Sequence, residues 1–359
     1  MTDALDLVAV SLLPTRMWRL AADALRGGGS PAQVLSSLVT ARWPADASRL
    51  STLRADAAAA LARAATAGIG RVTWSDPAYP IALTTIADPP AVIWTRGRVE
   101  ALNATAVAIV GSRAASQYGL SVAGQLAGDL ATRGVVVVSG LARGVDSAAH
   151  RGALAAGGVT IGVLGSGVDV IYPREHASLA AQIDERGAVI SELVPGTPPT
   201  PFFFPLRNRI ISGLSRAVVV VEANEKSGSL ITARCALDQG RDVLAVPGNV
   251  LTGRNRGAHA LLRDGAKIVE SADDILEELG VRIDPSASGC TEKRGATPAD
   301  DPVLACLTPG EPCDLDAIAE RCGLGPAALL PRLLALELAG IVERIGGGRF
   351  VRADRTVLG

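Results

Sequence analysis

The clearest pattern in the chain is an alternation of short apolar runs with amphipathic segments between residues 104 and 270. The apolar runs lack polar alternation and are too short for helices, which is typical of strands buried on both faces. The expected strands are 107–111, 135–139, 159–164, 188–191, 217–221, 242–246 and 266–269. The expected helices are 116–132, 144–156, 175–184, 207–214, 229–239 and 257–263. This order predicts an α/β fold with a mainly parallel sheet covered by helices on both faces.

The first 70 residues show helical periodicity instead. The expected helices are 5–13, 18–25, 31–38 and 48–67. They predict a small helical domain over 1–70, similar to a SAM or helix-hairpin-helix domain. The glycine-rich hairpin with which such domains grip phosphates is not evident, so packing or protein contact is the favoured role. Prolines then favour an extended connector over 71–103, packed on the core, with 92–95 as a candidate edge strand.

The last part of the chain predicts a separate small domain. An acidic helix over 272–279 completes the core, which ends at 283, and the polar, Gly- and Pro-containing stretch over 284–301 is typical of a linker. Residues 302–354 have the order of a winged helix, with three helices before a two-stranded wing. Its third helix has one arginine and no Asn, Gln or Lys for base edges, and the domain has 5 basic and 7 acidic residues. A protein-contact or regulatory role is therefore favoured over duplex reading.

Charge and composition narrow the class of protein. Residues 104–270 carry 16 basic and 13 acidic side chains, whereas residues 271–359 carry 9 and 15, so the middle of the chain is the better candidate for binding a polyanion. No apolar run reaches the length of a membrane span, and the N-terminus lacks a secretory signal. The five cysteines show no C-x-x-C spacing, and the three histidines show no ligand spacing. We therefore expect a cytoplasmic protein with reduced thiols and without a metal.

The candidate chemistry lies where the strands end. After the first strand, Gly111 permits a tight turn, Ser112 offers a hydroxyl and Arg113 adds a guanidinium before a helix begins, which is a good phosphate site. Comparable turns follow the later strands, and the carboxyl ends of parallel strands meet at one edge of a sheet. The candidate phosphate-binding residues are Gly111, Ser112, Arg113, Ser139, Gly140, Arg143, Gly165, Gly167, Arg174, Arg207, Asn208, Arg209, Ser227 and Ser229.

A chain of phosphates fits these dispersed arginines better than one nucleotide does. The dinucleotide motif G-x-G-x-x-G and the ATPase motif G-x-x-x-x-G-K-[ST] are absent, so no nicotinamide, flavin or ATP cofactor is expected. Phe202 to Phe204 stand beside the Arg-Asn-Arg cluster and fit either base stacking or a core or subunit contact. Helix capping and loop bracing explain Asp146, Asp169 and Glu222. The serines lack an evident His and acid partnership, so catalysis has little support.

Taken together, these motifs resemble the DNA-processing protein A family (DprA, also called Smf). The motifs that carry the resemblance are Gly111-Ser112-Arg113, Ser139-Gly140 through Asp146, Gly165-x-Gly167-x-Asp169, Arg207-Asn208-Arg209, Ser227-Gly228-Ser229 and Val246-Pro247-Gly248. The resemblance implies an extended Rossmann-like core over 104–283 that binds single-stranded DNA and forms a homodimer. It also implies a non-enzymatic protein that protects incoming DNA and helps load the RecA recombinase during natural transformation. The family's DNA pocket then corresponds to Ser112, Arg113, Gly140, Arg143, Arg207, Asn208 and Arg209.

Two other functions share parts of this pattern. A nucleoside-monophosphate phosphoribohydrolase on the same core would carry Pro-Gly-Gly-x-Gly-Thr-x-x-Glu, whereas this chain has Ser227-Gly228-Ser229 and no matching glutamate. A role as a duplex-DNA regulator that acts through the winged helix is disfavoured, because that domain has more acidic than basic residues. Parallel measurements of nucleotide turnover, single-strand binding and duplex binding distinguish these two functions from single-stranded DNA binding.

Overall fold

The computed structural model describes residues 2–280, 302–307, 313–338, 341–345 and 349–352. The predicted linker over 284–301 lies outside the described residues. The chain divides into two compact units, Met1–Arg282 and Ile283–Gly359.

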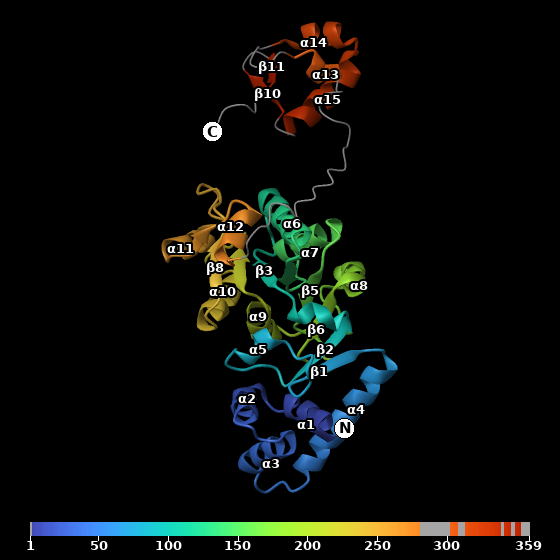
Figure 1. Cartoon of the computed structure of the whole chain (residues 1–359), viewed down its shortest axis with the longest axis vertical. Coiled ribbons are helices and arrows are strands. Elements are labelled where there is room, and N and C mark those ends of the chain that lie inside the picture. The colour runs from blue at the N-terminus through green and yellow to red at the C-terminus, as the bar shows by residue number, and fades with distance from the viewer. Residues whose placement is uncertain (1, 281–301, 308–312, 339–340, 346–348, 353–359) are drawn as a thin grey trace. The chain divides into compact units, whose positions relative to one another are not determined.

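The first unit is built on a nine-stranded sheet with the order β1-β2-β6-β5-β4-β3-β7-β8-β9. Figure 1 shows β1 and β2 at the end of the sheet nearest the N-terminal helices. The strands are β1 (Gly70–Thr73), β2 (Val92–Gly97), β3 (Ala106–Val110), β4 (Val136–Ser139), β5 (Thr160–Val163), β6 (Ala188–Ser191), β7 (Ala217–Val220), β8 (Asp242–Ala245) and β9 (Lys267–Ile268). Pairing is parallel from β6 through to β9, and antiparallel where β1 and β2 extend the sheet. This arrangement confirms the predicted α/β fold with a mainly parallel sheet.

Helices cover both faces of this sheet. They are α5 (Ile81–Thr84), α6 (Gln117–Thr132), α7 (Val145–Ala155), α8 (Ala177–Arg186), α9 (Phe203–Leu214), α10 (Ser229–Asp238), α11 (Arg256–Arg263) and α12 (Ala272–Glu278), with 3-10 turns η2 (Val99–Asn103) and η3 (Arg174–His176). Val107 and Ile109 of β3 pack in one buried cluster with α6 and α7, whereas Ala108 and Val110 pack in another with α9 and α10. Successive side chains of a strand point to opposite faces, so this strand must be apolar throughout.

Residues 71–103 add two strands to the sheet. The structure corrects the position of the candidate edge strand at 92–95, because β2 pairs with β1 on one side and with β6 on the other. Trp94 lies opposite Arg71 and Ser191 and is fully buried. Its apolar run without polar alternation is that of a strand covered on both faces. The edge strand on this side of the sheet is therefore β1.

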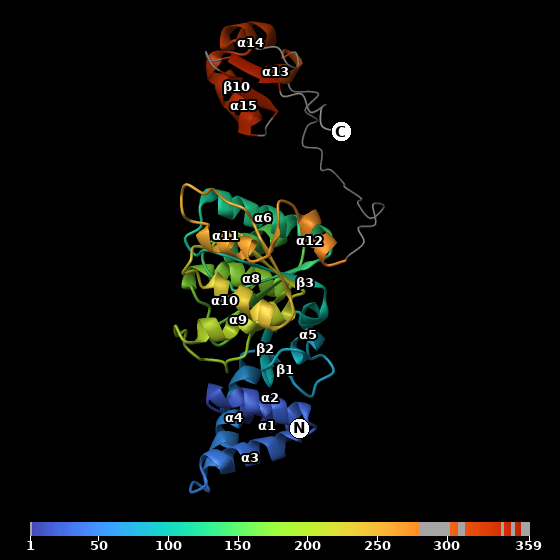
Figure 2. The same ribbon diagram turned by 90° about the vertical axis from the view of Figure 1, so that its left-hand side faces the viewer.

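The N-terminal helices are α1 (Thr2–Ser11), η1 (Thr15–Met17), α2 (Trp18–Arg26), α3 (Pro31–Arg42) and α4 (Arg49–Thr66). They share one buried cluster with β2 and α8, in which Leu7 and Leu35 join Trp94 and Leu179. Figure 2 shows these helices beside β1 and β2, at the end of the sheet that the antiparallel strands form. The helices and the sheet thus belong to one packed unit.

Helix α9 begins earlier than the sequence predicted. The expected start was residue 207, but the helix begins at Phe203 and includes Pro205 in its first turn. Proline is tolerated there because the first N–H groups of a helix have no partner within the helix. Phe203 and Phe204 therefore belong to the same rigid element as Arg207.

The second unit contains α13 (Pro302–Ala305), α14 (Leu315–Cys322), α15 (Pro326–Leu338) and a hairpin of β10 (Val342–Ile345) and β11 (Arg349–Arg352). Its buried cluster includes Ile318, Leu333 and Phe350. This is the predicted winged-helix order. On α15, Leu330 and Leu334 are exposed. None of the described helices has the length and apolar character needed to span a bilayer.

Candidate nucleic-acid interface

The site lies where the direction of the sheet's winding changes. From β3 the chain proceeds to β4 on one side, whereas β7 pairs with β3 on its other side. The turns that follow β3 and β7 therefore open a crevice at the carboxyl ends of these strands, which is where open α/β sheets bind ligands. The amide of Ser112 donates to the carbonyl of Glu222 at 2.6 Å and joins the two turns.

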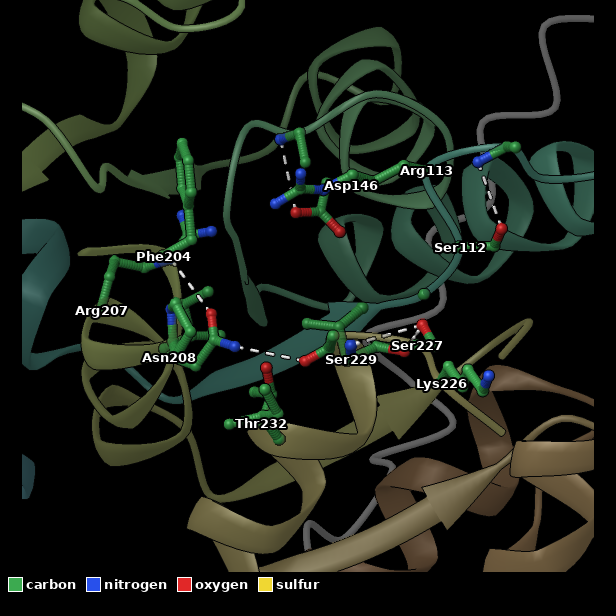
Figure 3. Close-up of a pocket in the computed structure, with 18 of the residues that line it drawn as sticks. Ser112, Arg113, Asp146, Phe204, Arg207, Asn208, Lys226, Ser227, Ser229 and Thr232 are labelled. Atoms are coloured by element: carbon green, nitrogen blue, oxygen red, sulfur yellow. Dashed lines mark hydrogen bonds between the residues drawn. The ribbon is translucent and has the colours of Figure 1, made fainter. Parts of the chain in front are cut away.

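This crevice is a cleft of about 640 Å³ that α9 closes on one side (Figure 3). Its lining includes Gly111, Ser112, Arg113, Asp146, Tyr172, Phe204, Arg207, Asn208, Lys226, Ser227, Ser229 and Thr232.

The turn after β3 brings an exposed cation to the cleft. A Cβ at Gly111 would lie 2.6 Å from Val145 Cγ2 and 2.9 Å from the carbonyl oxygen of Glu222, so the close packing of this turn requires glycine. Arg113 is exposed, and its guanidinium carbon lies 5.2 Å from the centre of the Phe204 ring. Across the described part of the chain, no carboxylate forms an ion pair with Arg113. Its positive charge therefore remains available to a ligand.

A second cation lies in the floor of the cleft. Arg207 is 6 % exposed, and its Nη1 donates to the carbonyls of Gly140, at 2.8 Å, and Val163. Burial lowers the pKa of Arg207 to about 10, although the Asp146 carboxylate opposes this shift and Arg113 adds to it. Arg207 therefore stays protonated at neutral pH and supplies a fixed positive charge.

Asp146 braces the turn after β4. Its Oδ2 accepts hydrogen bonds from the amides of Gly140, at 3.1 Å, and Ala142, at 3.4 Å. Burial raises the pKa of this carboxyl, while Arg207 and the two amides act in the opposite direction. This is the loop-bracing role that the sequence suggested.

The turn after β7 contributes hydroxyls, amides and a third cation. The Ser227 and Ser229 hydroxyl oxygens lie 2.7 Å apart at the start of α10. Asn208 Nδ2 donates to the carbonyl of Gly228 at 3.3 Å, which ties this turn to α9. Lys226 is exposed at the rim. A helix N-terminus with nearby cations favours an anion such as a phosphate.

Half of the predicted phosphate-binding residues meet in this cleft. They are Gly111, Ser112, Arg113, Arg207, Asn208, Ser227 and Ser229. Gly140 and Arg143 line a smaller adjoining hollow beside Tyr172 and Phe204. Arg143 is exposed there and forms a two-point ion pair with Glu175, with Nε to Oε1 at 2.6 Å and Nη2 to Oε2 at 2.8 Å.

The other five predicted residues lie outside the cleft lining. Ser139 is fully buried and donates to the carbonyl of Ile109 at 2.6 Å. A Cβ at Gly165 would lie 2.9 Å from Phe204 Cδ1, and one at Gly167 would lie 2.8 Å from the amide of Gly196, so both glycines serve packing. The remaining two are Arg174, which is exposed in η3, and Arg209, which is buried in an ion-pair cluster.

The cleft lining also contains Lys226, Tyr172 and Thr232, which the sequence patterns did not predict. Lys226 could have been found from the sequence, because it is a cation in the turn after β7, as Arg113 is a cation in the turn after β3. Tyr172 lies 5.5 Å from Phe204 between ring centres and is partly exposed, so the two rings form an aromatic wall. Thr232 follows Ser229 by one helical turn, and its position in the lining depends on how α10 is oriented.

A second hollow of about 560 Å³ is lined by residues at the start of α6 and in the segment that follows β8. Its lining includes Tyr118, Glu222 and Arg254. Both carboxylate oxygens of Glu222 accept hydrogen bonds from Ser116, and Arg254 donates to the carbonyl of Ala114 at 3.2 Å. In the ranges that the structure describes, no group of three or more His, Cys, Asp or Glu side chains is arranged to hold a metal ion.

Comparison with known proteins connects this geometry to a family. The family model for DNA recombination-mediator protein A matches residues 70–280, and the model for the DprA winged helix domain matches residues 290–348. The chain is 43% identical over 283 residues to protein Smf of Escherichia coli, which covers 77% of this chain and 75% of that protein. It is 46% identical over 203 residues to the DNA processing protein DprA of Streptococcus pneumoniae, covering 56% of this chain and 72% of the relative.

Two solved structures are also similar. The X-ray structure of DNA processing protein A from Streptococcus pneumoniae matches with a TM-score of 0.66 and 35% identity, over 76% of this chain and 95% of that one. A structure of DNA processing protein A from Helicobacter pylori, described as giving insights into its single-stranded DNA binding mode, matches with a TM-score of 0.53 and 30% identity. This second match covers 58% of this chain and 95% of that one.

Proposed function

Because this chain belongs to the DNA recombination-mediator protein A family, we propose that its cleft binds single-stranded DNA without sequence preference and without chemical change to the strand. The observation that carries the proposal is the convergence of Arg113, Arg207 and Lys226 on one cleft beside the start of α10. The single-stranded DNA binding that the Helicobacter pylori relative's description names supports the choice of ligand.

The proposed binding mode assigns phosphates and bases to different walls. Arg113, Lys226 and the amides at the start of α10 bind phosphates, while the buried charge of Arg207 adds attraction from below. Phe204 and Tyr172 offer ring faces for bases, and such stacking is tolerant of sequence because every base has a π face. In this mode, contacts to phosphates and to the faces of the bases can hold a strand of any sequence.

The lining of the cleft also supports a non-enzymatic role. Among the described lining residues, Asp146 is the sole carboxylate, and it is already engaged by two backbone amides. A phosphoribohydrolase would need a carboxylate that reaches the ribose. The turn before α10 supplies serines in its place.

The wider role that we propose is to protect incoming DNA and help load RecA during natural transformation and recombination. The family model's description as a recombination mediator supports this role. We further propose a homodimer through the Rossmann-like core, since two clefts on one strand would add avidity. Exposed Leu330 and Leu334 on α15 favour protein contact over duplex reading for the winged helix.

Removal of the Arg113 charge tests the site. We expect Arg113→Ala to weaken binding of every oligonucleotide and to reduce the dependence of log affinity on log salt concentration by about 0.7, the value for one single-strand phosphate contact. Fluorescence anisotropy with labelled oligonucleotides of several sequences measures both quantities. Arg133→Ala, which removes a charge outside the cleft, is the control. Unchanged affinity and salt slope in Arg113→Ala would contradict the assignment.

A further inference from the structure

Three consecutive side chains of α9 contact three different parts of the molecule. Arg207 reaches the ends of β4 and β5, and Asn208 reaches the turn after β7. Arg209 reaches neither the cleft nor solvent, although it was predicted to bind phosphate. Residues two positions apart on a helix lie about 200° apart around its axis, so Arg207 and Arg209 must project in nearly opposite directions.

Arg209 is the centre of a buried ion cluster. Its Nε donates to Asp88 Oδ2 at 2.8 Å and its Nη2 donates to Glu192 Oε1 at 2.6 Å. The Arg209 and Glu192 side chains are each 7 % exposed, whereas Asp88 is 31 % exposed. Burial lowers the pKa of Arg209, but the two carboxylates outweigh this effect and raise it overall. Arg209 is therefore charged and already neutralised by the protein.

The same cluster connects α9 to the N-terminal helices. Arg26 of α2 donates to the carbonyls of Ile86, at 3.2 Å, and Ala87, immediately before Asp88. The guanidinium carbon of Arg209 lies 6.0 Å from the centre of the Trp18 ring, and Trp18 also belongs to α2. Helix α2, the segment around Asp88 and helix α9 therefore meet at one buried charge.

From this arrangement we infer that Arg209 is a positioning residue through which the N-terminal helices fix α9, so that Phe204, Arg207 and Asn208 keep their places in the DNA cleft. The inference rests on the proposed single-stranded DNA function. It gives the N-terminal helices a part in DNA binding without any contact between them and DNA. It also predicts that Arg209 affects affinity but contributes no phosphate contact of its own.

Arg209→Met and Asp88→Ala test this inference in the full chain by anisotropy with a labelled oligonucleotide at several salt concentrations. We expect Arg209→Met to lower affinity by about tenfold and Asp88→Ala to lower it by about threefold, the scale seen for residues that act on a site without touching its ligand. The salt slope should stay at the wild-type value in both. Asp88→Ala keeps the test decisive if Arg209→Met does not fold, because Asp88 is partly exposed.

Two controls separate positioning from general loss of stability. Ile275→Ala removes a fully buried side chain of α12, which belongs neither to the N-terminal helices nor to the cleft lining, and should lower stability while affinity remains unchanged. Asp273→Ala breaks a 2.8 Å ion pair with Arg133 outside the cleft and should change neither. The wild-type protein and Arg113→Ala, measured in parallel, report separately on the proposed function.

Three results would overturn the inference. A folded Asp88→Ala or Arg209→Met variant with wild-type affinity would show that the cluster serves stability alone. A salt slope reduced by about 0.7 in Arg209→Met would make Arg209 a phosphate ligand after all. Equal loss of affinity in Ile275→Ala would assign the effect to destabilisation. If the wild-type protein binds no oligonucleotide, the proposed function fails and the inference falls with it.

Discussion

Arg113 and Arg209 carry the same guanidinium group in opposite surroundings. Arg113 lies on a turn at the end of β3, is exposed, and has an aromatic ring as its described neighbour. Arg209 lies on α9 between two carboxylates and is 7 % exposed. Both follow the simple rule that arginine attracts anions, but the anions of Arg209 belong to the protein itself. The charge of Arg113 therefore remains open to DNA, whereas the charge of Arg209 is already neutralised by two carboxylates of the protein.

The same difference separates two regions of the first unit. One region is open to DNA, and the other fixes helix α9 in place. The turns after β3 and β7 leave Arg113 and Lys226 open to solvent. The back of α9 is closed by Asp88, Glu192 and helix α2. Substitutions in the first region should change affinity with little effect on stability, and substitutions in the second should reduce stability most.

The largest expected effect sharpens this division. Arg209→Met should lower the free energy of unfolding by about 3–5 kcal/mol, because it leaves the Glu192 carboxylate buried without its partner. Arg113→Ala should change it by no more than about 0.5 kcal/mol. Urea unfolding at neutral pH measures both.

The pH dependence of Arg209→Met provides an additional check. Burial raises the pKa of Glu192 and Arg209 opposes that shift, so removing Arg209 raises the pKa further. When the pKa of an acid is higher in the folded state than in the unfolded state, the protein becomes more stable as the pH falls through the folded-state pKa. The deficit of the variant should therefore shrink on acidification. Equal stability losses in the two arginine variants would contradict the division.

The next effect concerns the aromatic wall. Phe204→Ala should weaken single-strand binding by about 1–3 kcal/mol for each base stacked, with similar losses for all sequences. Phe202→Ala is the matched control, because Phe202 is 60% exposed and lies outside the cleft lining. Anisotropy with homopolymeric and mixed oligonucleotides measures the loss. If both variants weaken binding equally, the rings act through the general apolar surface and not through the cleft.

The smallest expected effect concerns Arg143, whose surroundings are intermediate between those of Arg113 and Arg209. Arg143 is exposed like Arg113 but paired like Arg209, since Glu175 holds it through two hydrogen bonds. Glu175→Gln removes the competing charge and should strengthen DNA binding by about twofold, since exposed ion pairs are weak and screened by salt. Titrations at low salt detect this change best. Weaker binding would mean that Glu175 orients Arg143 for DNA instead of competing for it.

The sequence predicted the fold well for a definite reason. Strands such as Val107 to Val110 are buried on both faces, and burial leaves an apolar run that differs from the helical periodicity beside it. The strand at 92–95 was found by the same signal, but its neighbours were not. Strand order depends on pairing between distant segments, and a local pattern does not specify whether a strand is at the edge.

The site was predicted less completely because burial of a polar residue depends on distant partners. Arg207, Asn208 and Arg209 are adjacent in the sequence and were treated alike. Asp88, which neutralises Arg209, lies 121 residues away along the chain. The prolines that follow Asp88 predicted an extended connector and gave no indication of an ion pair. By contrast, the prediction for Gly111 to Arg113 depended only on the turn after one strand. The structure places all three residues in the cleft.

The hydrogen bonds that join the turns of the cleft have a consequence for the kinetics of binding. Ser112 is tied to Glu222, Asn208 to Gly228, and Arg207 to Gly140 before any strand arrives. A binding surface that is ordered in advance loses little conformational freedom when it captures its ligand. Encounter with a charged strand is then governed by diffusion and electrostatic steering, and differences in affinity appear in the rate of release. We therefore expect fast association with single-stranded DNA, and we expect the few contacts at the rim of the cleft to set the lifetime of the complex.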